Sequence, residues 1–337
     1  SDFFRRRKFF VIIGYMVAAI GKPLLAIANS FGLALGARLL DRTGKGIREA
    51  PRDALLAGGI SESHRGGAFG FLKSLDTSGA VIGNLTAFLL IYLAFSIREI
   101  FWIALIPAII AVIVVSGVKE TAPEIEKKHI KIRDLMNIKE WRGKFRPDFW
   151  KFIFVAGFFA FAKVSCAFLI LRADAVMHNK PLIPLLYLLY NIDFAAMAWP
   201  VGKFADKYGK RKFICAGYLL FALMSLGFIF AGNSLEVAGL FILYGVFFAF
   251  VEGNSRAFVS NVTDDSRRAT ALGIYNAVEG FILLPAGIIA GALWMIGDGI
   301  GTFVYSSILS SIAAVLFFFL FVYKKSCRIS CQNKCKI

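Results

Sequence analysis

Five ionisable side chains recur at helical spacing inside one otherwise apolar segment, residues 31–57. They follow one another at intervals of four, three, four and three positions: Arg38, Arg42, Lys45, Glu49 and Arg52. On a helix of about 3.6 residues per turn, this spacing makes one continuous charged stripe. Because ionisable groups are costly inside a membrane, they face a cavity or a partner instead of lipid. We therefore expect the stripe to face a central cavity or the neighbouring helices of the second half of the chain, with Arg38, Arg42 and Lys45 on the pathway of a solute or a coupling proton.

The same residues are also spaced for ion pairs within one helix. Lys45 can reach Glu49 one turn later, and Glu49 can reach Arg52. The alternative interpretation is therefore a latch of salt bridges near one end of the span. We assign Glu49 and Arg52 to this latch.

Asp193 is the ionisable residue with no evident ionic partner along the sequence, and it lies near the middle of the apolar segment 182–201. An isolated carboxylate at membrane depth is a candidate for proton coupling. Asn191, Tyr244 and Asn276 can supply the mixed polar and aromatic lining that small-molecule sites use. For the aromatic residue, anchoring at the membrane interface is the alternative.

Two further groups of charges lie inside apolar segments. Glu252 has Arg256 one helical turn later, and this spacing predicts that the two neutralise each other. Asp76 and Glu279 each lie near the start of a span, where the positive end of a helix favours an acid. A gating role is the alternative for Asp76, Glu279, Glu252 and Arg256.

The composition places these charges in a membrane protein. Of the 337 residues, 58% are apolar and 18% are charged, and phenylalanine alone occurs 35 times. An ordinary soluble domain has about 45–50% apolar and about 25% charged residues. The mean hydropathy of +0.68 agrees with this excess. The composition excludes a soluble enzyme and a disordered chain.

Ten segments are apolar over roughly the 20 residues that a membrane helix needs. None alternates between apolar and polar residues as the strands of a membrane barrel do. The predicted fold class is therefore an all-α integral membrane bundle. The ten predicted spans are 9–28, 31–57, 68–94, 98–118, 149–171, 182–201, 213–232, 235–258, 269–296 and 302–323.

Basic residues gather in alternate connections between these spans. The basic segments are 1–8, 119–148, 202–212 and 324–337, whereas the connections between them contain few basic residues. Because basic loops stay in the cytoplasm, this pattern predicts a plasma-membrane protein with both ends of the chain cytoplasmic. The same pattern explains the net charge of +17 without nucleic-acid binding.

The chain contains an internal repeat. Residues 61–70 (SESHRGGAFG) resemble residues 264–273 (DDSRRATALG), and the offset of 203 also relates Glu49 to Glu252 and Asp76 to Glu279. A parallel repeat with an even number of spans is typical of transporters built from two halves.

The repeat predicts four segments: a first half of four spans (1–118), a cytoplasmic linker (119–148), a second half of six spans (149–323) and a basic tail (324–337). The first half therefore has two spans fewer than the second. From this we expect a fragment, an incorrectly assigned start or a degraded gene. The alternative is a natural protein of ten helices.

One connection carries a specific motif, G-x-x-x-D-K-x-G-K-R-K at 202–212. Gly202 and Gly209 permit a tight turn between antiparallel helices. Asp206 can sit at the positive N-terminus of a neighbouring helix. Lys210 and Arg211 can hold the loop at the membrane surface.

This motif resembles the loop signature of the major facilitator superfamily, and residues 38–53 are similar to the charged fourth helix of that family. The resemblance extends over essentially the whole chain and implies two more helices than the ten counted here. It also implies that Asp206 latches the cytoplasmic side closed, and that Asp2 is its first-half copy. Gly79 and Gly83 resemble the helix-packing glycines of an antiporter signature, although Asn84 replaces its proline.

The sequence contains no motif for nucleotide binding, a catalytic metal or a nucleophile, so we expect no enzyme activity, cofactor or metal. Cys327, Cys331 and Cys335 are compatible with metal binding or palmitoylation, but a reduced tail is favoured. We expect a monomeric, proton-coupled efflux transporter of small solutes that works by alternating access. The alternative is a remnant or scaffold that does not transport. The substrate stays open.

Overall fold

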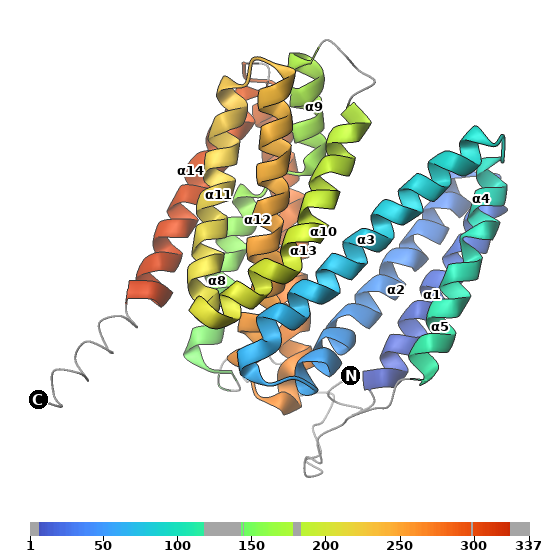
Figure 1. Ribbon diagram of the computed structural model, residues 1–337, viewed down its shortest axis with the longest axis horizontal. Coiled ribbons are helices and arrows are strands. Elements are labelled where there is room, and N and C mark those ends of the chain that lie inside the picture. Colours follow the sequence, from blue (N-terminus) through green and yellow to red (C-terminus); the bar gives the residue numbers. More distant parts are fainter. Residues whose placement is uncertain (1–6, 118–142, 144, 178–182, 298, 324–337) are drawn as a thin grey trace, which may run out of the picture. The chain divides into compact units, whose positions relative to one another are not determined.

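The computed structural model describes residues 7–117, 143, 145–177, 183–297 and 299–323, and the regular elements in these ranges are all helical (Figure 1). In chain order the α-helices are α1 (Arg7–Ala26), α2 (Phe31–Gly58), α3 (Arg65–Tyr92), α4 (Ile97–Ile103), α5 (Leu105–Gly117), α8 (Pro147–Ala162), α9 (Cys166–Val176), α10 (Ile183–Tyr208), α11 (Lys210–Phe230), α12 (Ser234–Asn261), α13 (Arg268–Trp294) and α14 (Ile300–Phe317). Short 3₁₀ turns precede α3 and α13, and a π-turn follows α14.

The helices confirm the predicted fold class, an all-α membrane bundle. Each of the ten predicted spans coincides with one helix or with two consecutive helices. Helices suit this environment because they satisfy their backbone hydrogen bonds internally. Within the described ranges, eight helical stretches are long and apolar enough to cross a membrane. α2, which carries the charged stripe, and α10 are outside this group.

Side-chain caps fix where several helices begin. Ser30 Oγ accepts the backbone N–H of Leu33 at the start of α2. Ser96 and Glu99 form a complete capping box at the start of α4. Because the first turn of a helix has no internal partners for its N–H groups, such caps define its first residue.

The described helices fall into two compact units. Unit 1 comprises the described residues within 1–61, 79–136 and 263–273. Unit 2 comprises those within 62–78, 137–262 and 274–337. Each unit is described by itself below.

In unit 1, α1 and α2 approach closely through two glycines. A Cβ atom on Gly14 would lie 2.7 Å from the carbonyl oxygen of Gly44, and one on Gly44 would lie 2.6 Å from the carbonyl oxygen of Gly14. Small residues permit this backbone contact between membrane helices. Lys8 of α1 donates a 2.7 Å hydrogen bond to the carbonyl oxygen of Ser116 in α5.

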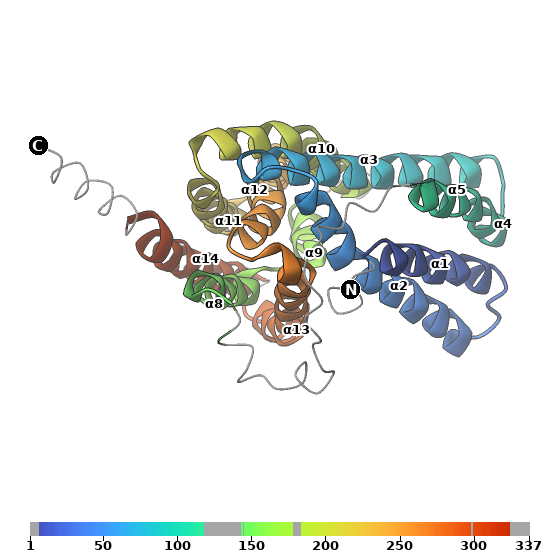
Figure 2. The ribbon, with the colours of Figure 1, turned by 90° about the horizontal axis from the view of Figure 1, so that it is seen from below.

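Unit 2 has an aromatic core. Phe159 of α8 stacks on Tyr218 of α11 with ring centroids 3.9 Å apart, and Phe221 and Phe247 close the cluster. α12 lies between α10 and α11 (Figures 1 and 2). Offset and edge-on aromatic contacts of this kind stabilise a helical core beyond simple burial.

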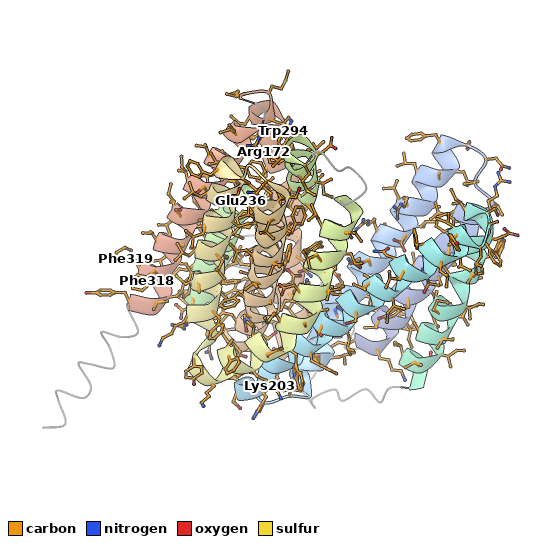
Figure 3. The ribbon with its side chains drawn as sticks, turned by 45° about the horizontal axis from the view of Figure 1, so that its top comes forward. Arg172, Lys203, Glu236, Trp294, Phe318 and Phe319 are labelled. Atoms are coloured by element: carbon orange, nitrogen blue, oxygen red, sulfur yellow. The ribbon has the colours of Figure 1, made fainter. Side chains whose placement is uncertain are left out.

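The outer surface of unit 2 is apolar along its length. Phe318 and Phe319 point outward at one end of the last helix, and both are exposed (Figure 3). Lys203 lies at one end of the unit, and Arg172 and Trp294 lie at the other (Figure 3). Large apolar side chains exposed over so wide a surface are what a lipid-facing bundle requires.

Candidate solute site and its charged neighbours

The helix that spans residues 147–176 is broken in its middle. α8 ends at Ala162 and α9 begins at Cys166, and Lys163 and Ser165 have extended backbone with ψ of 102° and 145°. Ser165 caps α9 by accepting the N–H of Ala167 at 3.4 Å. Within the described part of the chain, the N–H groups of Val164, Ser165 and Cys166 have no hydrogen-bond partner. Broken helices at membrane depth commonly form solute sites in transporters.

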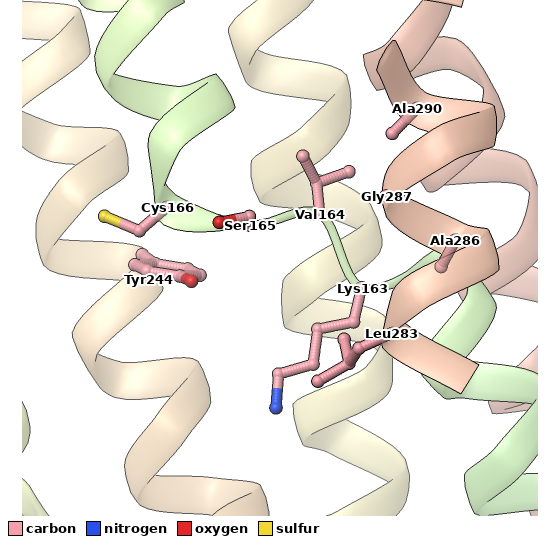
Figure 4. A pocket seen from close by; sticks show the side chains of 9 residues that line it. All are labelled: Lys163, Val164, Ser165, Cys166, Tyr244, Leu283, Ala286, Gly287 and Ala290. Carbon is pink, nitrogen blue, oxygen red and sulfur yellow. The ribbon is translucent and has the colours of Figure 1, made fainter. Parts of the chain in front are cut away.

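A cavity of about 370 Å³ opens at this break, and its size is in the range of small-molecule sites (Figure 4). Small residues of α13 leave the space that the cavity occupies. The residues that line it are Lys163, Val164, Ser165, Cys166, Tyr244, Leu283, Ala286, Gly287 and Ala290.

Tyr244 is the predicted lining residue that the structure places on this cavity. Its side chain is only 2% exposed and packs against Tyr190 with ring centroids 5.2 Å apart. The hydroxyl group lies on the cavity side of the ring (Figure 4) and makes no hydrogen bond to the described residues. Asn191 and Asn276 do not line the cavity, and Asn191 donates instead to the carbonyl oxygen of Tyr187 at 2.7 Å.

Lys163 forms a largely buried ion pair beside the cavity. Its Nζ lies 3.1 Å from Oε1 of Glu279 on α13, and the two side chains are 15% and 20% exposed. The same ammonium group lies 5.1 Å from the ring centroid of Phe248. Glu279 is thus held by an ion pair, a contact that its position near a helix start did not predict.

Glu252 of α12 lies between two cations. Its Oε1 is 3.1 Å from Arg256 and 3.2 Å from Lys73 of α3. The predicted neutralisation of Glu252 by Arg256 is confirmed, and Lys73 is an additional partner. Since charges buried in ion pairs are stable only while both partners remain, these contacts couple α3 to α12 within unit 2.

Asp193 of α10 presents a buried and unpartnered carboxylate oxygen. Its Oδ2 makes no hydrogen bond with the described residues. A Cβ atom at Gly245 of α12 would lie only 2.6 Å from this oxygen. The glycine therefore lets α12 approach the carboxylate, and the expected lack of an ionic partner agrees with the structure.

Asp206 caps the N-terminus of α3, the type of position predicted for it. Its Oδ1 accepts the N–H of Gly66 at 2.8 Å and its Oδ2 accepts that of Gly67 at 2.6 Å. Lys210 completes the arrangement, with Nζ 2.5 Å from Oδ1 of Asp206. A carboxylate at this position satisfies N–H groups that have no partner within their own helix.

The turn predicted at Gly202 is wrong. Gly202 lies inside α10, whereas the turn occurs at Gly209, whose φ of 105° is readily adopted only by glycine. Gly202 serves instead for close approach, because a Cβ atom on Gly66 would lie 2.8 Å from its carbonyl oxygen. One turn along, a Cβ atom on Gly70 would clash with the carbonyl group of Ala198.

Further hydrogen bonds join the start of α3 to the end of α12, and the turn before α3 to the start of α11. Arg65 donates to the carbonyl oxygen of Ser260 at 3.1 Å and to Oδ1 of Asn261 at 3.0 Å. Lys210 donates to the carbonyl oxygen of Glu62 at 3.1 Å. Arg211 does not join this group. It donates to the carbonyl oxygen of Phe321 at 3.2 Å.

The charged stripe of α2 belongs to unit 1, where Arg38, Arg42 and Lys45 are exposed. Lys45 pairs with Glu49 at 3.7 Å, as its spacing predicted. Arg52 lies 3.4 Å from Asp53, the next residue in the chain. The pathway and latch roles of these residues stay predictions.

Several predicted residues lie away from these clusters. Asp76 is exposed. A Cβ atom on Gly79 or Gly83 would meet nothing within 4 Å, so their predicted packing role has no counterpart among the described residues. Asp2, most of the 119–148 linker, and the tail with Cys327, Cys331 and Cys335 are outside the described residues.

Sequence reasoning missed Lys163, Lys73 and Arg65. Lys163 and Lys73 are each a lone cation in an apolar run, and that rarity was the available signal. Arg65 lies within the repeated segment 61–70, to which no site role is assigned from the sequence.

Comparisons with known proteins agree with this architecture. A family model described as the Major Facilitator Superfamily matches residues 1–178 and 153–328. The chain is 36% identical over 327 residues to an uncharacterized MFS-type transporter of Methanocaldococcus jannaschii, with 95% of this chain and 80% of that protein covered. Multidrug resistance protein 2 of Bacillus subtilis is 34% identical over 125 residues, which are 35% of this chain and 30% of that protein.

Solved structures show the same fold. The human organic anion transporter MFSD10 matches with a TM-score of 0.79 at 15% identity, covering 92% of this chain and 77% of that chain. A variant of the E. coli fucose:proton symporter matches with a TM-score of 0.73 at 13% identity, covering 93% of this chain and 83% of that chain. At these identities the likeness establishes the fold alone.

The helical bundle, its apolar surface and its buried charges define a multi-pass integral membrane protein of the solute-transporter class. The chain belongs to the Major Facilitator Superfamily, a family of secondary transporters of small solutes.

Proposed function

We propose that this protein is a proton-coupled transporter that exports small solutes by alternating access, acting as a monomer in the plasma membrane with both ends of the chain cytoplasmic. The observation that carries the coupling is the buried, unpartnered oxygen of Asp193. A carboxylate buried without a partner is costly in its charged form. Binding a proton removes that cost, so occupancy of Asp193 is a means by which a proton gradient can bias the conformation.

Alternating access also needs contacts that hold in one state and break in the other. The cap that Asp206 provides to α3, together with its pair to Lys210, is the candidate for such a latch. It joins residues of the first repeat to the motif of the second. A second set of exchangeable pairs joins Glu252 to Arg256 and Lys73, and Glu279 to Lys163.

Export, as distinct from uptake, has two supports. The spacing of Gly79 and Gly83 resembles an antiporter signature. One partial relative carries the name of a multidrug resistance protein. An exporter would take its solute from the cytoplasm and return protons inward.

The test uses the full chain in liposomes that enclose a pH-sensitive dye. An imposed pH gradient should drive flux of at least one solute from a panel of benzoate, glucose and ethidium, and that solute should in turn move protons. Asp193→Asn should remove the dependence of flux on the gradient. The matched control is Asp174→Asn, which alters an exposed carboxylate of α9. Unchanged coupling in Asp193→Asn would remove this residue from the mechanism, and no flux of any panel member would contradict transport.

A further inference from the structure

We propose that the break between α8 and α9 binds the carboxylate group of a small organic acid that has an apolar body. The inference deepens the proposed transport function, since it names the solute class that the transporter would recognise. Binding to the site can nevertheless be measured without transport.

The first argument is the backbone at the break. Three consecutive N–H groups, those of Val164, Ser165 and Cys166, have no hydrogen-bond partner among the described residues. They precede and begin α9, a helix of 11 residues whose N-terminus carries partial positive charge. Successive free N–H groups at such a position form an anion-binding concavity.

The second argument is independent of the backbone. Tyr244 comes from a different helix and is nearly fully buried, and its hydroxyl group lies on the same cavity without a hydrogen bond to the described residues (Figure 4). This hydroxyl group can therefore donate a hydrogen bond to an acceptor in the cavity. A carboxylate oxygen of the ligand would accept that bond.

The third argument concerns the sign of the ligand's charge. The residues that line the cavity include one with a cationic side chain, Lys163, and two with hydroxyl groups, Ser165 and Tyr244. None of the residues that line the cavity in the described ranges is a carboxylate. A lining that contains a cationic residue and no acidic one favours an anion over a cation.

Lys163 can supply hydrogen-bond donors, but its pair with Glu279 carries no net charge. Its ammonium group has three donors, of which one bonds to Glu279 at 3.1 Å. Two donors therefore remain for other acceptors.

The rest of the cavity wall is the reason for proposing a ligand with an apolar body. Val164, Leu283, Ala286 and Ala290 present aliphatic carbon to the cavity. With a volume of about 370 Å³, the cavity can hold a small aromatic or branched acid but not a large conjugate.

The test measures binding of radiolabelled benzoate to the detergent-solubilised full chain, with benzamide as the neutral competitor of the same shape. Saturable benzoate binding is expected, with benzamide competing at least about tenfold more weakly, because it lacks the charge that the donors recognise. Tyr244→Phe should weaken benzoate binding about tenfold through the lost hydrogen bond. Lys163→Arg, which keeps the charge, should bind more tightly than Lys163→Gln. Tyr305→Phe, outside the cavity, should bind as the unaltered protein does.

Labelling of Cys166 gives a second measurement that does not depend on substituting the site. In a variant that keeps Cys166 and has serine at the other four cysteines, benzoate should slow modification by N-ethylmaleimide. In the matched variant that keeps only Cys215, benzoate should not change the rate. Both residues are free thiols of intermediate exposure, which makes the comparison fair.

The outcomes separate this inference from the proposed function. Benzoate binding with the expected variant effects, but without gradient-driven flux, would support the site and contradict proton-coupled transport. Transport of other solutes together with equal binding of benzoate and benzamide would overturn the site and leave transport standing. Absence of saturable benzoate binding, an unchanged Tyr244→Phe, or equal protection of Cys166 and Cys215 would each overturn the site.

Discussion

The ammonium group of Lys210 donates a hydrogen bond of 3.1 Å to the backbone carbonyl oxygen of Glu62, within unit 2. Within unit 1, Arg7 donates a bond of 2.5 Å to the carbonyl oxygen of Asp265. A shift of 203 residues carries Arg7 to Lys210 and Glu62 to Asp265. The shift of 203 residues therefore converts each of these hydrogen bonds into the other. This exchange is expected if a two-fold axis relates the two repeats.

The cap on α3 gives the first prediction. Asp206→Ala should lower the free energy of unfolding by about 1–2 kcal/mol, because two N–H groups of α3 lose their acceptor. Asp206→Asn should lose less, since its amide oxygen still accepts one of them. Thermal unfolding in detergent, followed by circular dichroism, measures both. Equal losses for alanine and asparagine would show that the charge matters and the cap does not.

The glycines of α3 give the second prediction. Gly70→Ala should destabilise the protein by about 1–3 kcal/mol, because the new methyl group would overlap the carbonyl group of Ala198. The control on the same helix is Gly79→Ala, whose added methyl group meets nothing within 4 Å. That variant should be neutral or up to about 1 kcal/mol more stable, from helix propensity alone. Destabilisation by Gly79→Ala would instead support the packing role that the sequence predicted for it.

The spans were predictable because each membrane-crossing helix must be apolar over most of its length, and this requirement is local in the sequence. The end of α10 was not predictable in this way. Residues 202–208 continue the helix, although their glycine and charges indicated a turn. Gly202 is inside the helix because α3 packs closely against it, and α3 is far away in the sequence.

The site was predictable only in part for the same reason. Asp193 and Tyr244 are conspicuous because polar groups are rare in apolar segments. The break at Lys163 contains neither glycine nor proline, and its local signal is Ser165, the serine that caps α9. The pairing of Lys73 with Glu252 joins helices that the sequence does not place together.

The ion pair beside the cavity gives the third prediction. Lys163→Ala or Glu279→Ala should each cost about 3 kcal/mol of stability, because each leaves a largely buried charge without its partner. Removing both together should cost less than the sum of the two, since neither charge is then left alone. The control pair is Lys151 with Asp148, 3.9 Å apart and each more than two-fifths exposed. Lys151→Ala should change stability by less than about 1 kcal/mol. Additive losses at Lys163 and Glu279 would contradict their coupling.

The contact between Gly245 and Asp193 gives the fourth prediction. Gly245→Ala should reduce gradient-driven flux by about tenfold or more, because its methyl group would lie 2.6 Å from Oδ2 of Asp193 and 2.7 Å from the carbonyl oxygen of Tyr190. The control on the same helix is Gly239→Ala, which meets nothing within 4 Å and should leave flux unchanged. Gly245→Ala should add little to the loss already caused by Asp193→Asn if displacement of that carboxylate is its main effect. Flux is measured in liposomes at equal protein content, with thermal unfolding as the check on folding. A further loss in the double variant would show that Gly245 acts on transport by another route, such as the packing of α10 on α12.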